Sequence, residues 1–544
     1  ILAGGTVFHP DDFRGLDRYI EQRRKAVHNP ALSIALVDEN GIAYTMGFGR
    51  MRGPGTGVVV PDTLFEIGSV SKTFAAVAAL QAVEAGLLDL YAPVQRYLPW
   101  FEVRSRYSAP ITPQHLLSHS AGLPYSVDFS PDPRAAVWGL REIEAGFAPG
   151  THFTYSEPGY QILTLVLERV YGRPYAQIVR DGILDPLGMY NSHAAIVQAL
   201  RPDLPQGYRP LYDDRPPHPS HPLVPAGWVE LNSADGAIAS TAADMSEFVR
   251  MLLRHGRGPR GCLLSEESYR QMTTEVIPGS GYGYGIYIHS EEGHRRLAHG
   301  GDMPGYEAYI AMDMDRGLGV VVLAAQPYPA GLWGQVYAYW RAAGAGLEPP
   351  LLAVPPDPER VANAADYAGT YRGQAKTLQV VAEGDRLYLE LGEERVVLEQ
   401  RGEDRFYANH PAPDRFLFQF GRAEGTAAVP GPVVELLHGP DWYAHERYDG
   451  TRTFAYPPEW DAYAGHYRAH NPWLSNFRVV VRRGALWFVW PWGDEDPLLP
   501  LEGNLFRLGA APYSPERVRF DQIVDGHALR AMLSGCAYYR FFTP

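Results

Sequence analysis

The chain has 544 residues, 46% of them hydrophobic, and a formal net charge of −14. Two or three domains are expected at this length, because one hydrophobic core rarely organises more than about 300 residues. The net negative charge argues against nucleic acid as a partner, because its phosphates would be repelled. No apolar stretch approaches the ~18 residues of a membrane-spanning helix.

Cysteine and histidine usage indicates neither a disulfide framework nor a metal site. Cys262 and Cys536 are too few for a framework, and the histidines lack metal-ligand spacing to cysteines or carboxylates. We therefore expect no metal and no other cofactor. The chain starts at Ile1 rather than Met, so the question whether a signal segment was removed stays open. The compartment also stays open: bacterial cytoplasm, periplasm or secretion.

The first elements predict a helix followed by a hairpin. Residues 11–27 carry apolar side chains at helical spacing. Residues 31–37 and 41–47 are β-rich runs that flank the turn sequence at 38–41, so an antiparallel pair is expected.

The next apolar run predicts a buried helix that begins at Ser69 and ends near Gly86. Ser69 and Lys72 stand three residues apart, so on a helix they share one face. A serine hydroxyl becomes a nucleophile when a neighbouring base takes its proton, and a lysine amine can help. The backbone N–H of Ser69 also points where an oxyanion would develop. Taken alone, the pair equally fits an ordinary capped helix.

Further helices are predicted from Thr112, over 160–170, and from Ser240 to Leu253. Between them, residues 202–225 hold eight prolines, which excludes a helix or a central strand. A rigid roof over a cleft and a plain surface excursion are both open for this segment. Four strands and a closing helix follow, at 284–288, 296–299, 306–312, 318–323 and around Trp333 to Trp340.

The last part of the chain contains an internal repeat. Residues 367–372 recur as 463–468, which is 96 residues further on (463 − 367), after a proline-rich linker at 348–358. Short alternating strands joined by turn residues predict a small antiparallel β-barrel for each copy. The barrels would support the rest of the protein or form an oligomer contact.

Four motifs together resemble the penicillin-recognising serine hydrolases, in the branch of class C beta-lactamases, family VIII esterases and D-aminopeptidases. They are Ser69-x-x-Lys72, the Leu-Leu-Ser-His-Ser-Ala-Gly-Leu-Pro run at 116–124, Tyr155-Ser156-Glu157 and His299-Gly300-Gly301. The resemblance covers about residues 20–345, and the two barrels extend it to the architecture of the D-aminopeptidases. It implies an α+β fold, an antiparallel sheet flanked by helices, followed by two small antiparallel barrels. The expected domains are a hydrolase domain and two accessory barrels, at 1–350, 359–456 and 459–544.

The resemblance also implies roles for individual residues. Ser69 would be the nucleophile, Lys72 and Tyr155 the proton-transfer pair, and the N–H groups of Ser69 and Asp302 the oxyanion hole. A tyrosine serves as a base only if a nearby cation such as Lys72 lowers the pKa of its phenol. His119 would be a structural residue of its turn.

Two departures from the family pattern bear on the substrate. His299-Gly300-Gly301 replaces Lys-Thr-Gly, so the lysine and threonine that hold a substrate carboxylate are gone. Glu157 replaces an asparagine, and Asp302 adds a second acid beside the glycines. An anionic substrate would be repelled, which argues against beta-lactamase and carboxypeptidase activity.

Five residues are candidates for substrate contacts: Glu157, His299, Gly300, Gly301 and Trp473. Trp473 lies in the 469–476 loop, which is longer than its counterpart in the first copy. Because a last-barrel loop approaches the site in the D-aminopeptidases, we expect this loop to reach the cleft, with an oligomer contact as the alternative. Glu157 has two interpretations: it attracts a substrate α-amine, or it pairs with Lys72 and leaves Tyr155 as the base.

The predicted function is a serine hydrolase that acts through an acyl-enzyme. The preferred substrate is a small peptide or amino-acid amide, cleaved as by an aminopeptidase. An esterase is the alternative, and a slow-acylating penicillin-binding or peptide-sensing protein is the second alternative. The intact Ser69, Lys72 and Tyr155 argue against an inactive scaffold. Stereochemical preference and homo-oligomer formation stay open.

Overall fold

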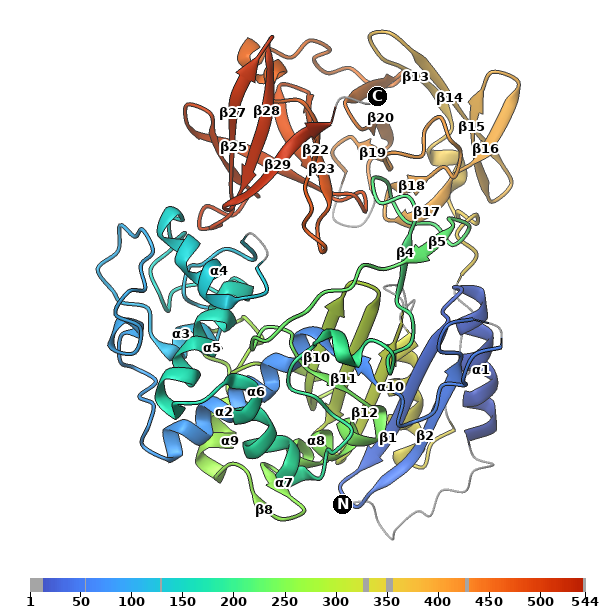
Figure 1. Ribbon diagram of the computed structural model, residues 1–544. Coiled ribbons are helices and arrows are strands. Elements are labelled where there is room, and N and C mark those ends of the chain that lie inside the picture. Colours follow the sequence, from blue (N-terminus) through green and yellow to red (C-terminus); the bar gives the residue numbers. More distant parts are fainter. Residues whose placement is uncertain are drawn as a thin grey trace.

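The computed structural model describes residues 13–53, 55–127, 130–325, 332–348, 356–425 and 430–541. A helix-and-sheet region forms one end of the molecule, and two β units lie side by side at the other end (Figure 1). Within those ranges no helix has the length and hydropathy to cross a membrane. The predicted proline-rich linker falls mostly on 349–355, outside the described residues.

The helix-and-sheet region is built on a six-stranded antiparallel sheet with the order β2-β1-β12-β11-β10-β9. The predicted hairpin is confirmed, since β1 pairs with β2, and β12 from late in the region pairs with β1 on its other edge. The strands are β1 Ala31–Asp38, β2 Ile42–Gly49, β9 Tyr287–Glu291, β10 His294–Met303, β11 Tyr306–Asp313 and β12 Leu318–Ala324.

Helices cover both faces of this sheet. On one face lie α1 (Arg14–Ala26) and α10 (Leu332–Gly344), where the buried Trp340 donates its indole N–H to Val37 O at 2.9 Å. On the other face lie α2 (Ser71–Glu84) and α8 (Ala242–Leu253), whose rings Phe74 and Phe248 stack at 3.6 Å. Helix α2 is therefore buried in the hydrophobic core between the sheet and the remaining helices.

The predicted start of the catalytic helix is shifted by half a turn. A 3₁₀ turn, η2 (Gly68–Val70), carries Ser69, and α2 begins at Ser71. The turn is possible because Gly68 adopts a φ of +49°, which side chains rarely allow. Ser69 thus projects from a tight turn that follows the short strand β3 (Phe65–Glu66).

The Tyr155-Ser156-Glu157 motif lies at the start of a helix. Helix α5 (Glu157–Tyr171) is capped by the Ser156 hydroxyl, which accepts the Gly159 N–H, so Tyr155 lies just before the helix and Glu157 is its first residue. The other elements of this layer are short: α3 Pro113–Leu117, α4 Pro133–Gly139, α6 Tyr175–Val179, α7 Asp185–Leu187 and α9 Glu266–Met272.

Both copies of the repeat form antiparallel β units, as predicted. The second copy is a closed barrel in the order β22 to β29. The first is nearly closed: its nine-stranded sheet ends at β16 (Glu394–Val397) and β17 (Glu399–Gly402), which are successive in the chain. Buried aromatic and aliphatic side chains fill the interior of each unit, so neither is a hollow container.

The remaining strands of these units are short. In the first unit they are β13 Gly369–Arg372, β14 Thr377–Glu383, β15 Arg386–Leu391, β18 Arg405–Tyr407, β19 Phe418–Arg422, β20 Val433–His438 and β21 Asp441–His445. In the second they are β22 Gly465–Arg468, β23 Asn476–Arg482, β24 Ala485–Val489, β25 Glu495–Glu502, β26 Leu505–Leu508, β27 Arg517–Val524, β28 His527–Leu533 and β29 Cys536–Phe541.

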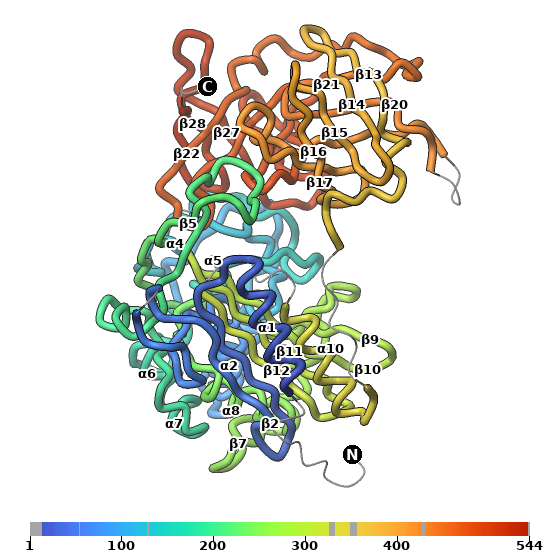
Figure 2. The backbone as a smooth tube through the Cα atoms, turned by 90° about the vertical axis from the view of Figure 1, so that its right-hand side faces the viewer, coloured from blue at the N-terminus to red at the C-terminus, as the bar shows by residue number. Residues whose placement is uncertain are grey.

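The proline-rich segment forms a strut between the two ends of the molecule. Its strands β4 (Tyr208–Pro210) and β5 (Leu223–Pro225) pair only with each other. Residues 211–222 between them reach the β units, as Figure 1 and the side view in Figure 2 both show. The Asp213 carboxylate accepts hydrogen bonds from Arg468 at 2.6 Å and Ser475 at 2.7 Å. Other contacts join Asp214 to Arg478, Arg215 to Asp414 and His218 to Glu399.

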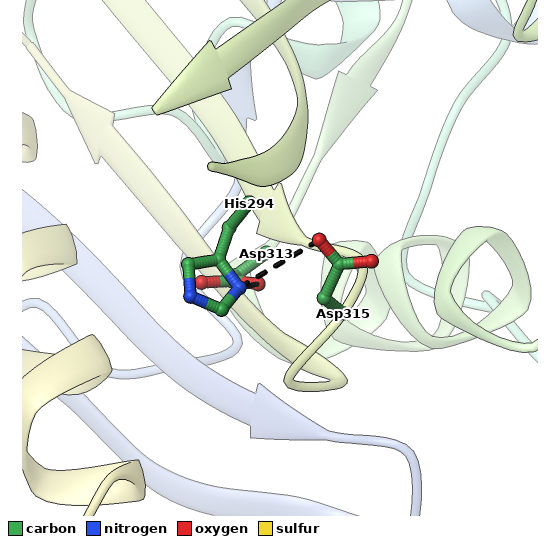
Figure 3. A group of neighbouring side chains, drawn as sticks. All are labelled: His294, Asp313 and Asp315. Carbon is green, nitrogen blue, oxygen red and sulfur yellow. Dashed lines mark ion pairs between the residues drawn. The ribbon is translucent and has the colours of Figure 1, made fainter. Parts of the chain in front are cut away.

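An ion-pair cluster fastens α10 to the sheet. His294, Asp313 and Asp315 converge where β10 starts and β11 ends (Figure 3). Their spacing would admit a cation, but the buried Asp313 carboxylate already pairs with Arg316 at 3.0 Å and Arg341 at 2.9 Å. Two guanidinium groups neutralise this acid, so the cluster serves packing.

The strut contacts generate a prediction. Replacing Asp213 with Ala removes two charge-assisted hydrogen bonds to the β22–β23 hairpin, so that hairpin should exchange its amide hydrogens faster. Asp181→Ala, which removes an exposed ion pair with Arg173 elsewhere, is the matched control. Unchanged protection of residues 465–476 in the Asp213 variant would show that the strut does not hold this unit.

Candidate active site

Ser69 and strand β10 approach each other as closely as their backbones permit. A Cβ on Gly301 would lie 2.0 Å from Ile67 O and 2.9 Å from Ser69 N. A Cβ on Gly68 would lie 2.7 Å from Asp302 N. Glycine at both positions is therefore a steric requirement, and it brings the backbone N–H groups of Ser69 and Asp302 into one small region.

Lys72 is fully buried and donates to three acceptors. Its Nζ lies 2.9 Å from Ser69 Oγ, 2.5 Å from Glu157 Oε2 and 2.6 Å from the backbone oxygen of Asp235. An ammonium group has three protons and no lone pair. Lys72 can therefore take a proton from Ser69 only after it has given one to another group, and Glu157 is the acidic neighbour that can receive it.

Glu157 is the partly exposed carboxylate that pairs with Lys72. Its side chain is 21% exposed, and Lys72 is the common partner that links it to Ser69. Burial raises the pKa of Glu157 to about 7, against the opposing effect of Lys72. Of the two interpretations of this residue, pairing with Lys72 is the contact that the structure contains.

Tyr155 is a neutral phenol in this arrangement. Its ring centroid lies 4.1 Å from that of His119 and 5.0 Å from Lys72 Nζ. Burial and the charge of Glu157 raise the pKa of Tyr155 well above its ordinary value. The condition for Tyr155 to serve as a base, a pKa lowered by Lys72, is therefore not met in this arrangement. The part that Tyr155 plays in proton transfer stays a prediction.

Two buried histidines support the site from behind. His119 Nδ1 accepts the Ser156 N–H at 3.0 Å, which fixes the residue after Tyr155. His299 is 2% exposed, with Nε2 at 3.1 Å from the Tyr282 hydroxyl and Nδ1 at 2.6 Å from Gly300 O. Burial lowers the pKa of His119 well below its usual range and that of His299 to about 3, so both are neutral. A substrate contact of His299, Gly300 or Gly301 stays a prediction.

Two further acids, Asp302 and Glu307, lie on β10 and β11 next to the Ser69 turn. Asp302 is exposed, but the surrounding protein atoms partly desolvate its carboxyl group, and this raises the pKa of Asp302. Glu307 pairs with it in register across β10 and β11, and burial together with Asp302 raises the pKa of Glu307 to about 8. Burial and the charges of Glu157 and Asp302 raise the pKa of Tyr125, so both acids lie near this ring.

The second barrel contacts this region through a turn that the sequence did not single out. The Tyr125 N–H donates to Glu516 Oε1 at 2.5 Å, and Tyr125 lies 5.8 Å from the Tyr155 ring. Tyr513 of the same turn stacks on His152 at 4.1 Å. No local signal could reveal a contact between residues 391 positions apart.

The 469–476 hairpin, predicted to reach the cleft, contacts the strut through Ser475 and Asp213. Trp473 is 42% exposed, and its contact with substrate stays a prediction.

Comparison with known proteins decides the family. A model described as Beta-lactamase matches residues 16–345. The chain belongs to the beta-lactamase family. The chain is 27% identical over 381 residues to penicillin-binding protein 4 of Amycolatopsis lactamdurans, and the alignment covers 66% of this chain and 98% of that protein. It is 27% identical over 416 residues to penicillin-binding protein 4* of Bacillus subtilis, covering 68% and 86%.

Solved structures agree with this family fold. The octameric penicillin-binding protein homologue of Pyrococcus abyssi aligns with a TM-score of 0.57 and 25% identity over 79% of this chain and 99% of that one. A beta-lactamase/D-alanine carboxypeptidase of Pseudomonas syringae aligns with a TM-score of 0.51 and 20% identity over 62% and 99%. The predicted superfamily and fold are confirmed, and the chain is a serine hydrolase.

Removing the Ser69 hydroxyl should abolish hydrolysis without unfolding the protein. Ser69→Ala should lower kcat/KM by at least ~10³-fold, because no acyl-enzyme can form. A fluorophosphonate probe followed by peptide mass spectrometry should label Ser69 in the parent and in the exposed control variant Ser108→Ala. An adduct found only at another residue would overturn the assignment.

Proposed function

We propose that this protein is an aminopeptidase-type serine hydrolase that cleaves small peptides or amino-acid amides with a free α-amine. The observation that carries the proposal is Glu157, a carboxylate 2.5 Å from Lys72 Nζ in the network that holds Ser69. Asp302, whose backbone lies beside the Ser69 turn, adds a second acid. An α-ammonium group gains Coulomb attraction there, whereas a substrate carboxylate is repelled. The departure from Lys-Thr-Gly at 299–301 removes the cation that would offset this field.

The proposed acylation step uses the network as a proton relay. Lys72 passes a proton to ionised Glu157 and takes the Ser69 proton, while Ser69 Oγ attacks the carbonyl carbon. The N–H groups of Ser69 and Asp302 receive the oxyanion. Neutral Tyr155 donates its proton to the leaving amine, and the proton taken from Ser69 restores the phenol. Water then attacks the acyl ester by the reverse sequence and releases the acid.

Two alternatives share this chemistry and differ in substrate. An esterase would accept neutral acyl esters and have no use for an ammonium site. A slow acylator is favoured by one specific observation, the two relatives named penicillin-binding proteins. It would form the Ser69 adduct but turn over slowly, so deacylation rates separate it from a peptidase.

Substrate charge gives the sharpest test. The unmutated enzyme should hydrolyse D- or L-alanine p-nitroanilide about tenfold or more faster than the N-acetylated compound, since the blocked amine loses the attraction of Asp302. Asp302→Asn should reduce that preference, whereas Asp315→Asn, an exposed acid at the far end of β11, should not. Equal rates on free and blocked substrates would defeat the aminopeptidase proposal and leave the esterase.

The relay makes a separate prediction about pH. Glu157 accepts a proton only when ionised, so kcat/KM on p-nitrophenyl acetate, which does not titrate, should fall as pH drops below about 7. Glu157→Gln should lower kcat and remove this limb. Persistence of the same limb in the Gln variant would assign it to another group.

A further inference from the structure

A cavity of about 780 Å³ lies between the two β units, and its lining includes none of the residues around Ser69. Its size falls within the ~300–1,000 Å³ typical of small-ligand sites. One wall comes from the first unit, including Arg405, Gln419 and Leu437, and the other from strands β23 to β25 of the second. The repeat therefore creates a site that neither copy forms alone.

Three tryptophans dominate the wall of the second unit. The rings of Trp490 and Trp492 are nearly parallel, with centroids 5.0 Å apart at 17°. Each indole N–H donates to a carboxylate, Trp490 to Asp496 at 2.8 Å and Trp492 to Asp494 at 2.9 Å. These bonds fix the ring planes, and Trp492 is still 47% exposed. Trp487 is the third tryptophan, and Phe454 adds a fourth aromatic ring to the lining.

The polar groups of the cavity are held in place and balance in charge. Three arginines and three carboxylates line it: Arg405, Arg482, Arg483, Asp494, Glu495 and Asp496. Arg405 pairs with Asp494 at 2.8 Å across the two units, and Arg482 pairs with Glu495. The lining is therefore neutral overall but dense in oriented donors and acceptors.

The two walls are locked to each other by backbone contacts. Gly493 adopts a φ of +98°, and a Cβ there would lie 2.7 Å from the Leu417 side chain of the first unit. Arg482 donates to the backbone oxygen of Gly439 at 2.7 Å. The Trp492 turn is thus seated against the other unit, and the cavity is formed before any ligand arrives.

We propose that this cavity binds a saccharide. Flat aromatic faces match the apolar C–H face of a pyranose ring, and fixed carboxylate, guanidinium and amide groups match its hydroxyls. The neutral lining gives no net attraction to an anion or a cation. Aliphatic side chains are few, Leu437 and Ala485, so the apolar surface of the cavity is formed mainly by aromatic rings.

Calorimetric titration of the full chain with cellotetraose, maltotetraose and chitotetraose tests the proposal. At least one saccharide should bind saturably with a Kd below about 1 mM. Trp492→Ala and Trp487→Ala should each weaken binding by about tenfold, and Trp492→Phe should retain part of it. Trp138→Ala, which removes a 52% exposed tryptophan on α4, should leave the affinity unchanged.

Hydrolysis at Ser69 and near-ultraviolet circular dichroism report whether each variant is folded. Folded variants that bind the saccharide as tightly as the parent would overturn the proposal. Failure of all three saccharides to bind the parent would do the same, as would saturable binding of tetra-alanine in place of them.

Discussion

The structure depends on one buried charge, the ammonium group of Lys72. A buried ammonium costs several kcal/mol of solvation unless it is paired and its protons are accepted. Glu157, Ser69 and the backbone oxygen of Asp235 provide that, and they come from three separate segments. The Asp235 side chain is held in turn by Gln161 at 2.9 Å and by Ser233. The same contacts that make the lysine tolerable also position the nucleophile.

The exchange of asparagine for glutamate at 157 changes how this charge is used. A carboxylate at 2.5 Å from Nζ can hold a proton, which an amide cannot. Burial and the charge of Glu157 both oppose ionisation of the Tyr155 phenol, so its pKa is raised. In the proposed relay the proton-transfer unit is a trio of Lys72, Glu157 and Tyr155, and its titration belongs to the group as a whole.

The accessory units are coupled to the site through two routes. The Glu516 carboxylate accepts the Tyr125 N–H, and burial raises the pKa of Glu516. The strut, residues 208–225, joins the second barrel to the helix-and-sheet region through the hydrogen bonds of Asp213 to Arg468 and Ser475. These contacts support a role for the second barrel in shaping the cleft wall, which a purely external buttress would not have.

Local patterns predicted most of the catalytic region. The Ser69 to Lys72 spacing works even though Ser69 lies in a 3₁₀ turn, because the turn continues directly into α2. The β1–β2 hairpin and the capped start of α5 also follow from their own residues.

Other features depend on long-range packing and could not be predicted. The raised pKa of Tyr155 requires knowing that this phenol is buried beside Glu157. The contact of Glu157 with Lys72 joins residues 85 positions apart. The Glu516 contact and the inter-barrel cavity arise only when separate units dock. The domain limits at 350, 359, 456 and 459 stay predictions.

The most direct measurement is an infrared titration of the Glu157 carboxyl group, read from the difference between the parent protein and Glu157→Gln. The difference spectrum removes the other buried acids, Glu66 and Glu307, which also titrate high. The account predicts one carboxyl band that converts to carboxylate near pH 7. Conversion near the ordinary value of 4.5 would contradict it, because so weak a base could not take a proton from the Lys72 ammonium group and the proposed relay would fail.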